Sequence, residues 1–408
     1  MDRTIHLNTE VPARTRKLSG PGAVCVLYAL AGALLAGCWQ AATVHFNYRG
    51  NWTALFCTGS QFPVPPELAA GTYTFQGSNG YDGQFYRYVA HDPWFQKGWS
   101  RYCDQPVLRR VRITLPALAW ILAAGQDRAI DAAYIGVVLL SIGAGIYWLA
   151  RYVAAQGGKA AWGLMFLLIP GTLISIDRLT IDIALIALTA AWVWYIRSDC
   201  AVGLYIVLVL AGLTRETGLL LTGACCVHAL RDRRWRKAAL YATAALPAAA
   251  WYSVVVAHVG LANFRGAGPH PWWFYFRLLA GIVQRMFQLN HYPFGPVLNH
   301  AIQALDIVAL CGMLLATALA VWVVLRKGRL ERQRWGVAGF LALLLSLNMG
   351  GFWKDAYSYA RPFSPLLLLL GLGAATGSRW LLAPVILIDL RIAAQYAPQF
   401  WGILRGLL

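Results

Sequence analysis

The sequence has 408 residues, of which 59% are hydrophobic and only 13% are charged. Its mean hydropathy of +0.52 lies far above that of an average soluble domain, which excludes an ordinary water-soluble enzyme. The net charge of +18 would suggest nucleic acid as the partner of a soluble protein, but most Lys and Arg lie at the ends of apolar runs and form no nucleic-acid-binding motif. The composition therefore predicts an integral membrane protein whose partners include membrane lipids and no nucleic acid.

Apolar runs long enough to cross a hydrocarbon core of about 30 Å recur along the chain. The first run has no convincing cleavage site after it, so a retained helix is expected. Basic clusters before this run, at 231–237 and at 326–334 indicate the cytoplasmic connections. They predict a plasma (inner) membrane protein with a cytoplasmic basic tail at 1–20 and one polytopic domain at 21–408. We expect an all-α fold of about eleven transmembrane helices, at 22–46, 130–151, 160–176, 179–196, 201–214, 216–230, 238–260, 301–325, 335–353, 363–378 and 380–397.

Residues 47–129 form one long connection, which this topology places on the extracytoplasmic side with interfacial helices. Within it, 113–125 is apolar but too short for a span, so we expect an interfacial or re-entrant helix. The arginines that precede it would then meet lipid headgroups; they are Arg109, Arg110 and Arg112. The same connection holds Cys57 and Cys103, which could form a disulfide in an oxidising compartment.

The stretch "NGYDGQFYRYVAHDPW" at 79–94 is unusually polar and aromatic for this chain. Asp82 before a glycine predicts a helix N-cap, and the apolar spacing that follows predicts a short amphipathic helix on the membrane surface that stops before Pro93. An unbroken helix would hold Asp82 and Asp92 about 15 Å apart, too far to share one metal ion. Spacing alone leaves Asp82 either a capping residue or a general base, and Asp92 either a contact point or a helix stop.

Ionisable residues recur at later junctions on the outer side of this topology. They are Asp177, Arg178, Asp182, Arg215 and Glu216. Charged groups at the membrane are costly and suggest function, although such pairs also cap or neutralise helix ends. The recurrence of such residues at these junctions favours a polar cavity that they share.

The connection at 264–296 is rich in aromatic residues interleaved with arginines, and Arg361 lies at the outer start of a late helix. An aromatic belt and a snorkelling anchor are the ordinary interpretations. The same residue types would also suit a groove for a lipid phosphate, with rings along the prenyl chain and guanidinium groups on the phosphate.

Three segments resemble one family: "GYDGQFYRYVAHDP" in the first loop, "LTRETGLLL" at a later junction and "YARPFSPLLLLL" near the end. They look like segments of multi-pass bacterial proteins related to polyprenyl-phosphate-sugar glycosyltransferases of the GT-C fold. The resemblance implies that Asp82 is the catalytic carboxylate and that Arg215 and Arg361 contact the donor phosphate. It implies substrate-binding or cavity roles for Tyr81, Gln84, Arg178, Asp182 and Glu216. No clean D-x-D motif is present, so no cofactor is predicted and the use of a divalent metal stays open.

These observations favour a membrane glycosyltransferase that moves a sugar from a polyprenyl-phosphate donor to a glycan, lipid or protein acceptor of the cell envelope. A base, a cation for the phosphate and exclusion of water would suffice for the chemistry. The alternatives are a transporter or lipid flippase that forms no bond, and a non-catalytic scaffold. Two repeated halves with broken helices at mid-membrane would favour a transporter. The sequence contains no convincing internal repeat.

Overall fold

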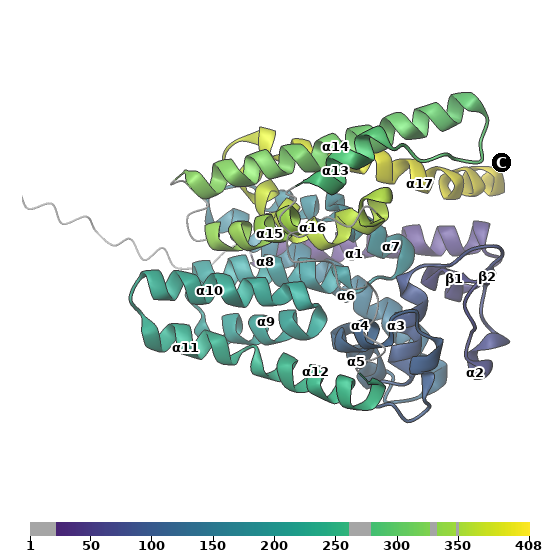
Figure 1. Cartoon of the computed structure of the whole chain (residues 1–408), viewed down its shortest axis with the longest axis horizontal. Helices are drawn as coiled ribbons and strands as arrows, with labels where there is room; N and C mark the ends of the chain where they lie inside the picture. Colours follow the sequence, from purple (N-terminus) through teal and green to yellow (C-terminus); the bar gives the residue numbers. More distant parts are fainter. Residues whose placement is uncertain (1–21, 261–278, 327–332, 348–350) are drawn as a thin grey trace, which may run out of the picture.

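The computed structural model describes residues 22–260, 279–326, 333–347 and 351–408. These residues are almost entirely helical, and the longer helices run side by side along one axis of the molecule (Figure 1). The first half of the chain contains α1 (Gly22–Asn47), η1 (Trp52–Phe56), β1 (Thr58–Gly59), α2 (Pro66–Ala69), β2 (Thr74–Phe75), α3 (Asp82–His91), η2 (Trp99–Tyr102), α4 (Pro106–Val111), α5 (Thr114–Leu122), α6 (Asp127–Ala155), η3 (Ala160–Leu168), α7 (Pro170–Arg178), α8 (Asp182–Ser198) and α9 (Ala201–Thr214). The second half contains η4 (Glu216–Gly218), α10 (Leu219–Arg231), α11 (Trp235–Thr243), α12 (Leu246–Val259), α13 (Ala280–Phe287), α14 (Pro296–Leu325), α15 (Arg334–Ser346), η7 (Phe352–Lys354), α16 (Ala356–Thr376), η8 (Arg379–Leu382) and α17 (Ala383–Leu407).

The all-α membrane architecture expected from the sequence is confirmed, whereas the count of eleven spans is not. Five helical segments of the described residues are long and apolar enough to cross a membrane, and the pair η3 and α7, bent by 62°, would make a sixth. Other helices lie at the predicted positions but are short. For example, α9 has 14 residues, which is about 21 Å of helix, less than a hydrocarbon core of about 30 Å.

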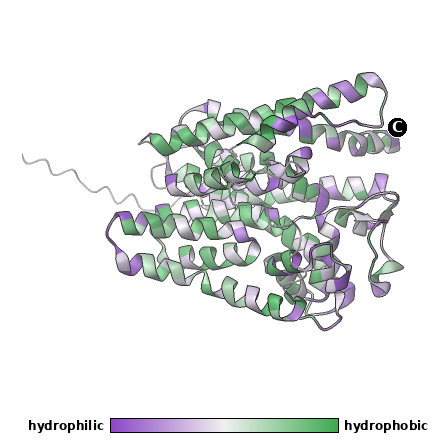
Figure 2. Ribbon diagram, in the orientation of Figure 1, coloured by the Kyte–Doolittle hydropathy of each residue, from purple (hydrophilic) through white to green (hydrophobic). Residues whose placement is uncertain are grey.

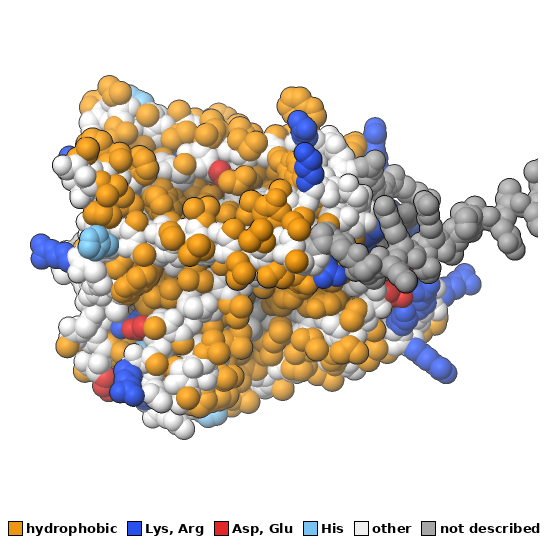
Figure 3. All heavy atoms as spheres, turned by 180° about the vertical axis from the view of Figure 1, so that it is seen from behind, with side chains coloured by type: hydrophobic (Ala, Val, Ile, Leu, Met, Phe, Trp, Pro, Cys, Tyr) orange, Lys and Arg blue, Asp and Glu red, His pale blue; other side chains and the backbone are white. Residues whose placement is uncertain are grey.

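Apolar side chains cover much of the outside of the bundle. The middle of the long helices is hydrophobic, whereas polar residues gather at helix ends and in the first long connection (Figure 2). The space-filling view shows the same distribution, with a broad hydrophobic surface and most Lys and Arg near the ends of the molecule (Figure 3). A surface of this kind suits lipid rather than water, so the chain is a multi-pass membrane protein.

The connection at 47–129 folds against one end of the bundle. Its only sheet is a two-residue parallel pairing in which Thr58 lies beside Thr74. Charged contacts fix it to α6: Arg87 makes two hydrogen bonds of 2.8 and 2.7 Å to the carboxylate of Asp131. His91 bridges Asp127 and Asp131 at 3.1 Å each.

Helix α3 is buried, so the prediction that it lies on the membrane surface is wrong. All its residues from Gly83 to His91 are buried, because the connection covers one side and α5 and α6 cover the other. A Cβ atom on Gly83 would overlap the carbonyl oxygen of Arg178, which explains the glycine after Asp82. The helix does end before Pro93 as predicted, with Asp92 as its C-cap.

Helix α5 occupies most of the predicted interfacial segment, but the arginines before it do not face lipid headgroups. Arg109, Arg110 and Arg112 are each less than 10% exposed and form ion pairs with carboxylates of the protein. The disulfide considered for Cys57 and Cys103 is not formed, since both thiols are free. The thiol of Cys57 instead accepts a hydrogen bond from Arg178 at 2.8 Å.

Candidate functional site

Asp82 is clamped between two arginines that come from distant parts of the chain. Arg109, on α4, makes a bidentate contact with its carboxylate at 2.8 and 2.9 Å. Arg361, on α16, donates to the same carboxylate at 2.7 Å. The side chain of Asp82 is 18% exposed, so these charges face one another with little water between them.

The cluster continues from Arg361 into the bundle. The guanidinium of Arg361 also lies 3.5 Å from the carboxylate of Asp182, at the start of α8. Asp182 in turn receives a hydrogen bond from Arg215, the residue that follows α9. The predicted residues Asp82, Asp182, Arg215 and Arg361 therefore belong to one connected network.

A further pair extends this network. The guanidinium of Arg112 contacts the carboxylate of Glu216 at 2.9 and 2.6 Å, and Arg215 lies 3.8 Å from the same carboxylate. The hydroxyl of Tyr86 accepts hydrogen bonds from Arg112 at 2.9 Å and from Arg109 at 3.3 Å. The side chain of Glu216 is 39% exposed, so solvent reaches this end of the network.

We call these seven ionisable residues the outer cluster, after the side on which the sequence predicts them: Asp82, Arg109, Arg112, Asp182, Arg215, Glu216 and Arg361. It contains four guanidinium groups and three carboxylates that alternate in space. Burial alone would raise the pKa of the Asp82 carboxyl, but Arg109 and Arg361 hold that pKa far below its usual range. Burial likewise opposes ionisation of Glu216, yet Arg112 and Arg215 lower its pKa to about 2. Both carboxylates are therefore ionised at neutral pH.

Local backbone features bring these side chains to one place. Asp82 is the first residue of α3 rather than its N-cap, and no side chain caps that helix. Its carboxylate is therefore free to bind the arginines instead of the backbone. Asp355 caps α16 and sets its start, which places Arg361 in the second turn. Arg215, the residue after α9, has an extended backbone with φ of −159°. The side chain of Arg215 therefore leaves the helix and contacts Asp182 at the start of α8.

The structure places three predicted substrate-binding residues beside the outer cluster rather than in it. The ring of Tyr81 lies under the guanidinium of Arg361, 4.7 Å from its centre, and its hydroxyl donates to a backbone carbonyl. Gln84 is fully buried and its amide bonds to the backbone of residues 59 and 79. Arg178 pairs with Asp177 at 2.9 Å.

Sequence reasoning missed Arg109, Arg112 and Tyr86. The run of arginines at 109–112 was an available signal, because the same connection carries carboxylates at Asp82 and Asp104 that need partners. Arg109 binds both of them, since its contacts with Asp104 are also 2.8 Å long.

Asp92 has no part in the outer cluster, in keeping with the expectation that the two aspartates of the stretch act apart. Its carboxylate pairs with Arg110 at 2.8 Å, and both side chains are completely buried. It also accepts hydrogen bonds from the backbone nitrogens of Lys97 and Trp99. Asp92 therefore fixes the fold of the connection after α3.

The predicted lipid groove and the open question of a metal site concern residues beyond the outer cluster. Most of the aromatic and basic residues predicted to line a lipid groove, including Trp272, Trp273 and Arg277, lie outside the described residues. Within the described residues, no group of three or more His, Cys, Asp or Glu side chains is placed to hold a metal ion.

No protein-family model, curated protein or solved structure matches this chain.

Proposed function

We propose that the chain is a membrane glycosyltransferase, which transfers a sugar from a polyprenyl-phosphate donor to a cell-envelope acceptor at the outer cluster. The observation that carries the proposal is the clamp of Asp82 between Arg109 and Arg361, with Arg215 joined to it through Asp182. It brings one partly exposed carboxylate beside several guanidinium groups. A base and a set of phosphate-binding cations are the groups that this reaction needs.

In the proposed reaction, Asp82 accepts the proton of the acceptor hydroxyl as its oxygen attacks the anomeric carbon. The bond between that carbon and the phosphate oxygen breaks, and the prenyl phosphate leaves with the electron pair. A phosphodiester with one negative charge becomes a monoester with nearly two, so guanidinium groups stabilise the leaving group more than the donor. Arg361 and Arg215 are the proposed partners of that charge.

The geometry adds a requirement for this mechanism. A carboxylate that accepts hydrogen bonds of 2.9 and 2.7 Å from two arginines, and has a further ion-pair contact of 2.8 Å with one of them, is a poor base. Binding of the donor must therefore draw Arg361, Arg109 or both away from Asp82 toward the phosphate. The freed carboxylate then regains basicity only once the donor is in place.

The function is tested with the purified full chain in nanodiscs, supplied with prenyl-phosphate sugars and a cell-envelope extract. The proposal expects release of prenyl phosphate together with a labelled acceptor, and loss of both products in Asp82→Asn. In sealed liposomes that contain the same chain, movement of the labelled lipid across the bilayer without release of prenyl phosphate would instead identify a flippase. If neither product nor movement depends on Asp82, the glycosyltransferase proposal is wrong.

A further inference from the structure

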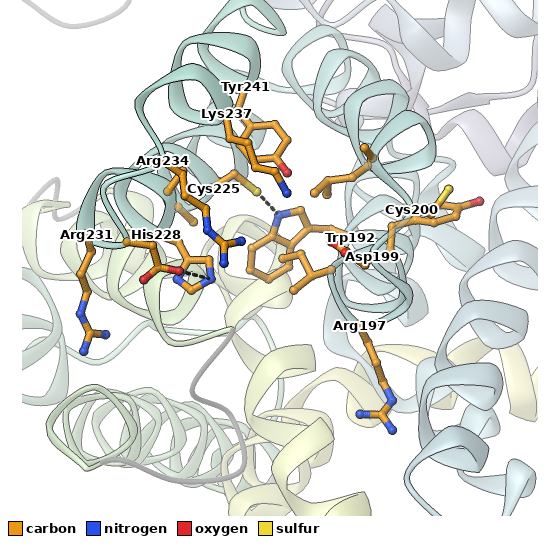
Figure 4. Close-up of a pocket in the computed structure, with 17 residues that line it drawn as sticks. Trp192, Arg197, Asp199, Cys200, Cys225, His228, Arg231, Arg234, Lys237 and Tyr241 are labelled. Carbon is orange, nitrogen blue, oxygen red and sulfur yellow. Dashed lines mark hydrogen bonds and ion pairs between the residues drawn. The ribbon is translucent and has the colours of Figure 1, made fainter. Parts of the chain in front are cut away.

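A cavity of about 670 Å³ opens between the ends of α8, α9, α10 and α11. Four cationic and two anionic side chains line it, together with aromatic and apolar residues (Figure 4). The cations are Arg197, Arg231, Arg234 and Lys237, and the anions are Asp199 and Asp232. A cavity with this surplus of positive charge attracts an anion.

Two of the cations point into the cavity. In Figure 4 the guanidinium of Arg234 and the ammonium of Lys237 both lie near the indole of Trp192, whereas Arg197 and Arg231 point away. Arg197 already donates to the carbonyl of Ala155 at 2.7 Å. Among the described residues, neither Arg234 nor Lys237 has an ion-pair partner, so both can bind a ligand.

Neither carboxylate of the cavity, Asp199 or Asp232, forms an ion pair with Arg234 or Lys237 among the described residues. Asp232 lies 3.9 Å from Nε2 of His228. Nδ1 of that histidine is buried and has no hydrogen-bond partner among the described residues. The indole of Trp192 donates to the thiol of Cys225 at 3.2 Å, which holds the ring at the cavity wall.

The cavity is distinct from the outer cluster. Helix α8 begins at Asp182, in the outer cluster, and ends at Ser198, beside the cavity. Its 17 residues separate the two sites by about 25 Å. The neighbouring α9 runs back from Ala201 to Thr214, next to Arg215. Figure 1 shows the turn between α10 and α11 at the opposite end of the molecule from α3.

We infer that this cavity binds a phosphate group, and that the phosphate belongs to the headgroup of an anionic phospholipid. Arg234 and Lys237 would hold the phosphate. Large apolar side chains stand exposed on the same helices: Trp235 is 67%, Leu240 51% and Val202 72% exposed. They provide a surface for acyl chains beside the cationic cavity, which a soluble phosphate would not use. This inference does not depend on the proposed function.

The test compares two double variants that remove the same charge from the same segment. Arg234→Gln with Lys237→Gln removes both cations from the cavity. Arg233→Gln with Arg236→Gln is the matched control, since neither residue lines it. Each purified chain is placed in phosphatidylcholine nanodiscs doped with phosphatidylglycerol, extracted into detergent, and the retained phosphatidylglycerol is measured by native mass spectrometry. Thermal unfolding with and without inorganic phosphate forms a second arm.

The expected result is that the wild type and the control retain phosphatidylglycerol, and that the cavity variant binds it about 30-fold more weakly. Equal retention in both double variants, or equal loss in both, would overturn the site, because the effect would then be absent or merely one of net charge. Stabilisation by inorganic phosphate that the cavity variant loses, without retained lipid in the wild type, would keep the phosphate site and overturn the lipid as its source.

Discussion

Replacing Asp82 by asparagine separates the two roles that the outer cluster assigns to this residue. The amide keeps the shape of the carboxylate but cannot accept a proton. It also lacks the negative charge that competes with a donor phosphate for Arg109 and Arg361. We therefore expect the variant to bind prenyl phosphate more tightly while it loses sugar transfer.

The magnitude follows from the contacts. The carboxylate makes three contacts of 2.7 to 2.9 Å and is 18% exposed, so its pairing is stronger than that of a surface ion pair, which is worth up to about 1 kcal/mol. Close charge pairs shielded from water couple by about 1.5 to 7 kcal/mol. Relief of about 2 kcal/mol would tighten prenyl-phosphate binding about 30-fold. Loss of the general base would lower turnover by roughly 10² to 10⁴.

The assay measures equilibrium binding of labelled prenyl phosphate and single-turnover sugar transfer on the same preparations. The variant is expected to fold, because Arg109 keeps its contacts with Asp104, and Arg361 keeps Asp182. Asp104→Asn is the matched control. Asp104 is 23% exposed and also binds Arg109 at 2.8 Å, and its substitution leaves the carboxylate of Asp82 unchanged. The control should keep transfer and change binding little. Wild-type transfer in Asp82→Asn would refute the base, and unchanged or weaker binding would refute the competition.

Four further outcomes are expected. Arg361→Lys, which loses the planar fork, should lower kcat for the donor about tenfold more than it raises KM, because Arg361 stabilises the leaving phosphate more than the bound donor. Asp92→Asn should lower the free energy of unfolding by about 3–5 kcal/mol in denaturation experiments without changing prenyl-phosphate affinity, because its arginine partner is left buried and unpaired. Gly83→Ala should lower the melting temperature, since the added Cβ overlaps the backbone of Arg178. Because the pKa of Asp82 is lower in the folded than in the unfolded chain, its ionised carboxylate stabilises the fold above pH about 4, and this stabilisation is lost as the pH falls further. The melting temperature below pH 4 should therefore depend on pH more steeply in the wild type than in Asp82→Asn.

Hydropathy and local spacing were enough to predict the helical membrane architecture and the short helix that starts at Asp82. Both depend on neighbouring residues in the sequence: apolar run length for the former, and the positions of Gly83 and Pro93 for the latter. The number of spans was not predictable in the same way. A run such as 201–214 is apolar enough for lipid but too short to span it as a straight helix.

The environment of α3 could not be predicted from its own residues. Its amphipathic pattern is equally compatible with a membrane surface and with a site inside the protein. The polar residues Arg87 and His91 find carboxylates on α6, from Asp127 and Asp131, so even the polar side of the helix is satisfied within the fold. Only the tertiary contacts distinguish the two cases.

The arginines at 109–112 show why proximity in sequence did not reveal the site. Arg109 binds Asp82, Arg110 binds Asp92 and Arg112 binds Glu216, so three near neighbours join three distant carboxylates. Helix α4 ends at Val111, and the chain turns at Arg112 before α5 begins. Each guanidinium therefore points to a different part of the molecule. Since Arg109 both binds Asp82 and holds α4 against α3, a phosphate that draws it away would also loosen the packing of the 47–129 connection on the bundle. Donor binding and the position of this connection are then coupled through the same ion pairs.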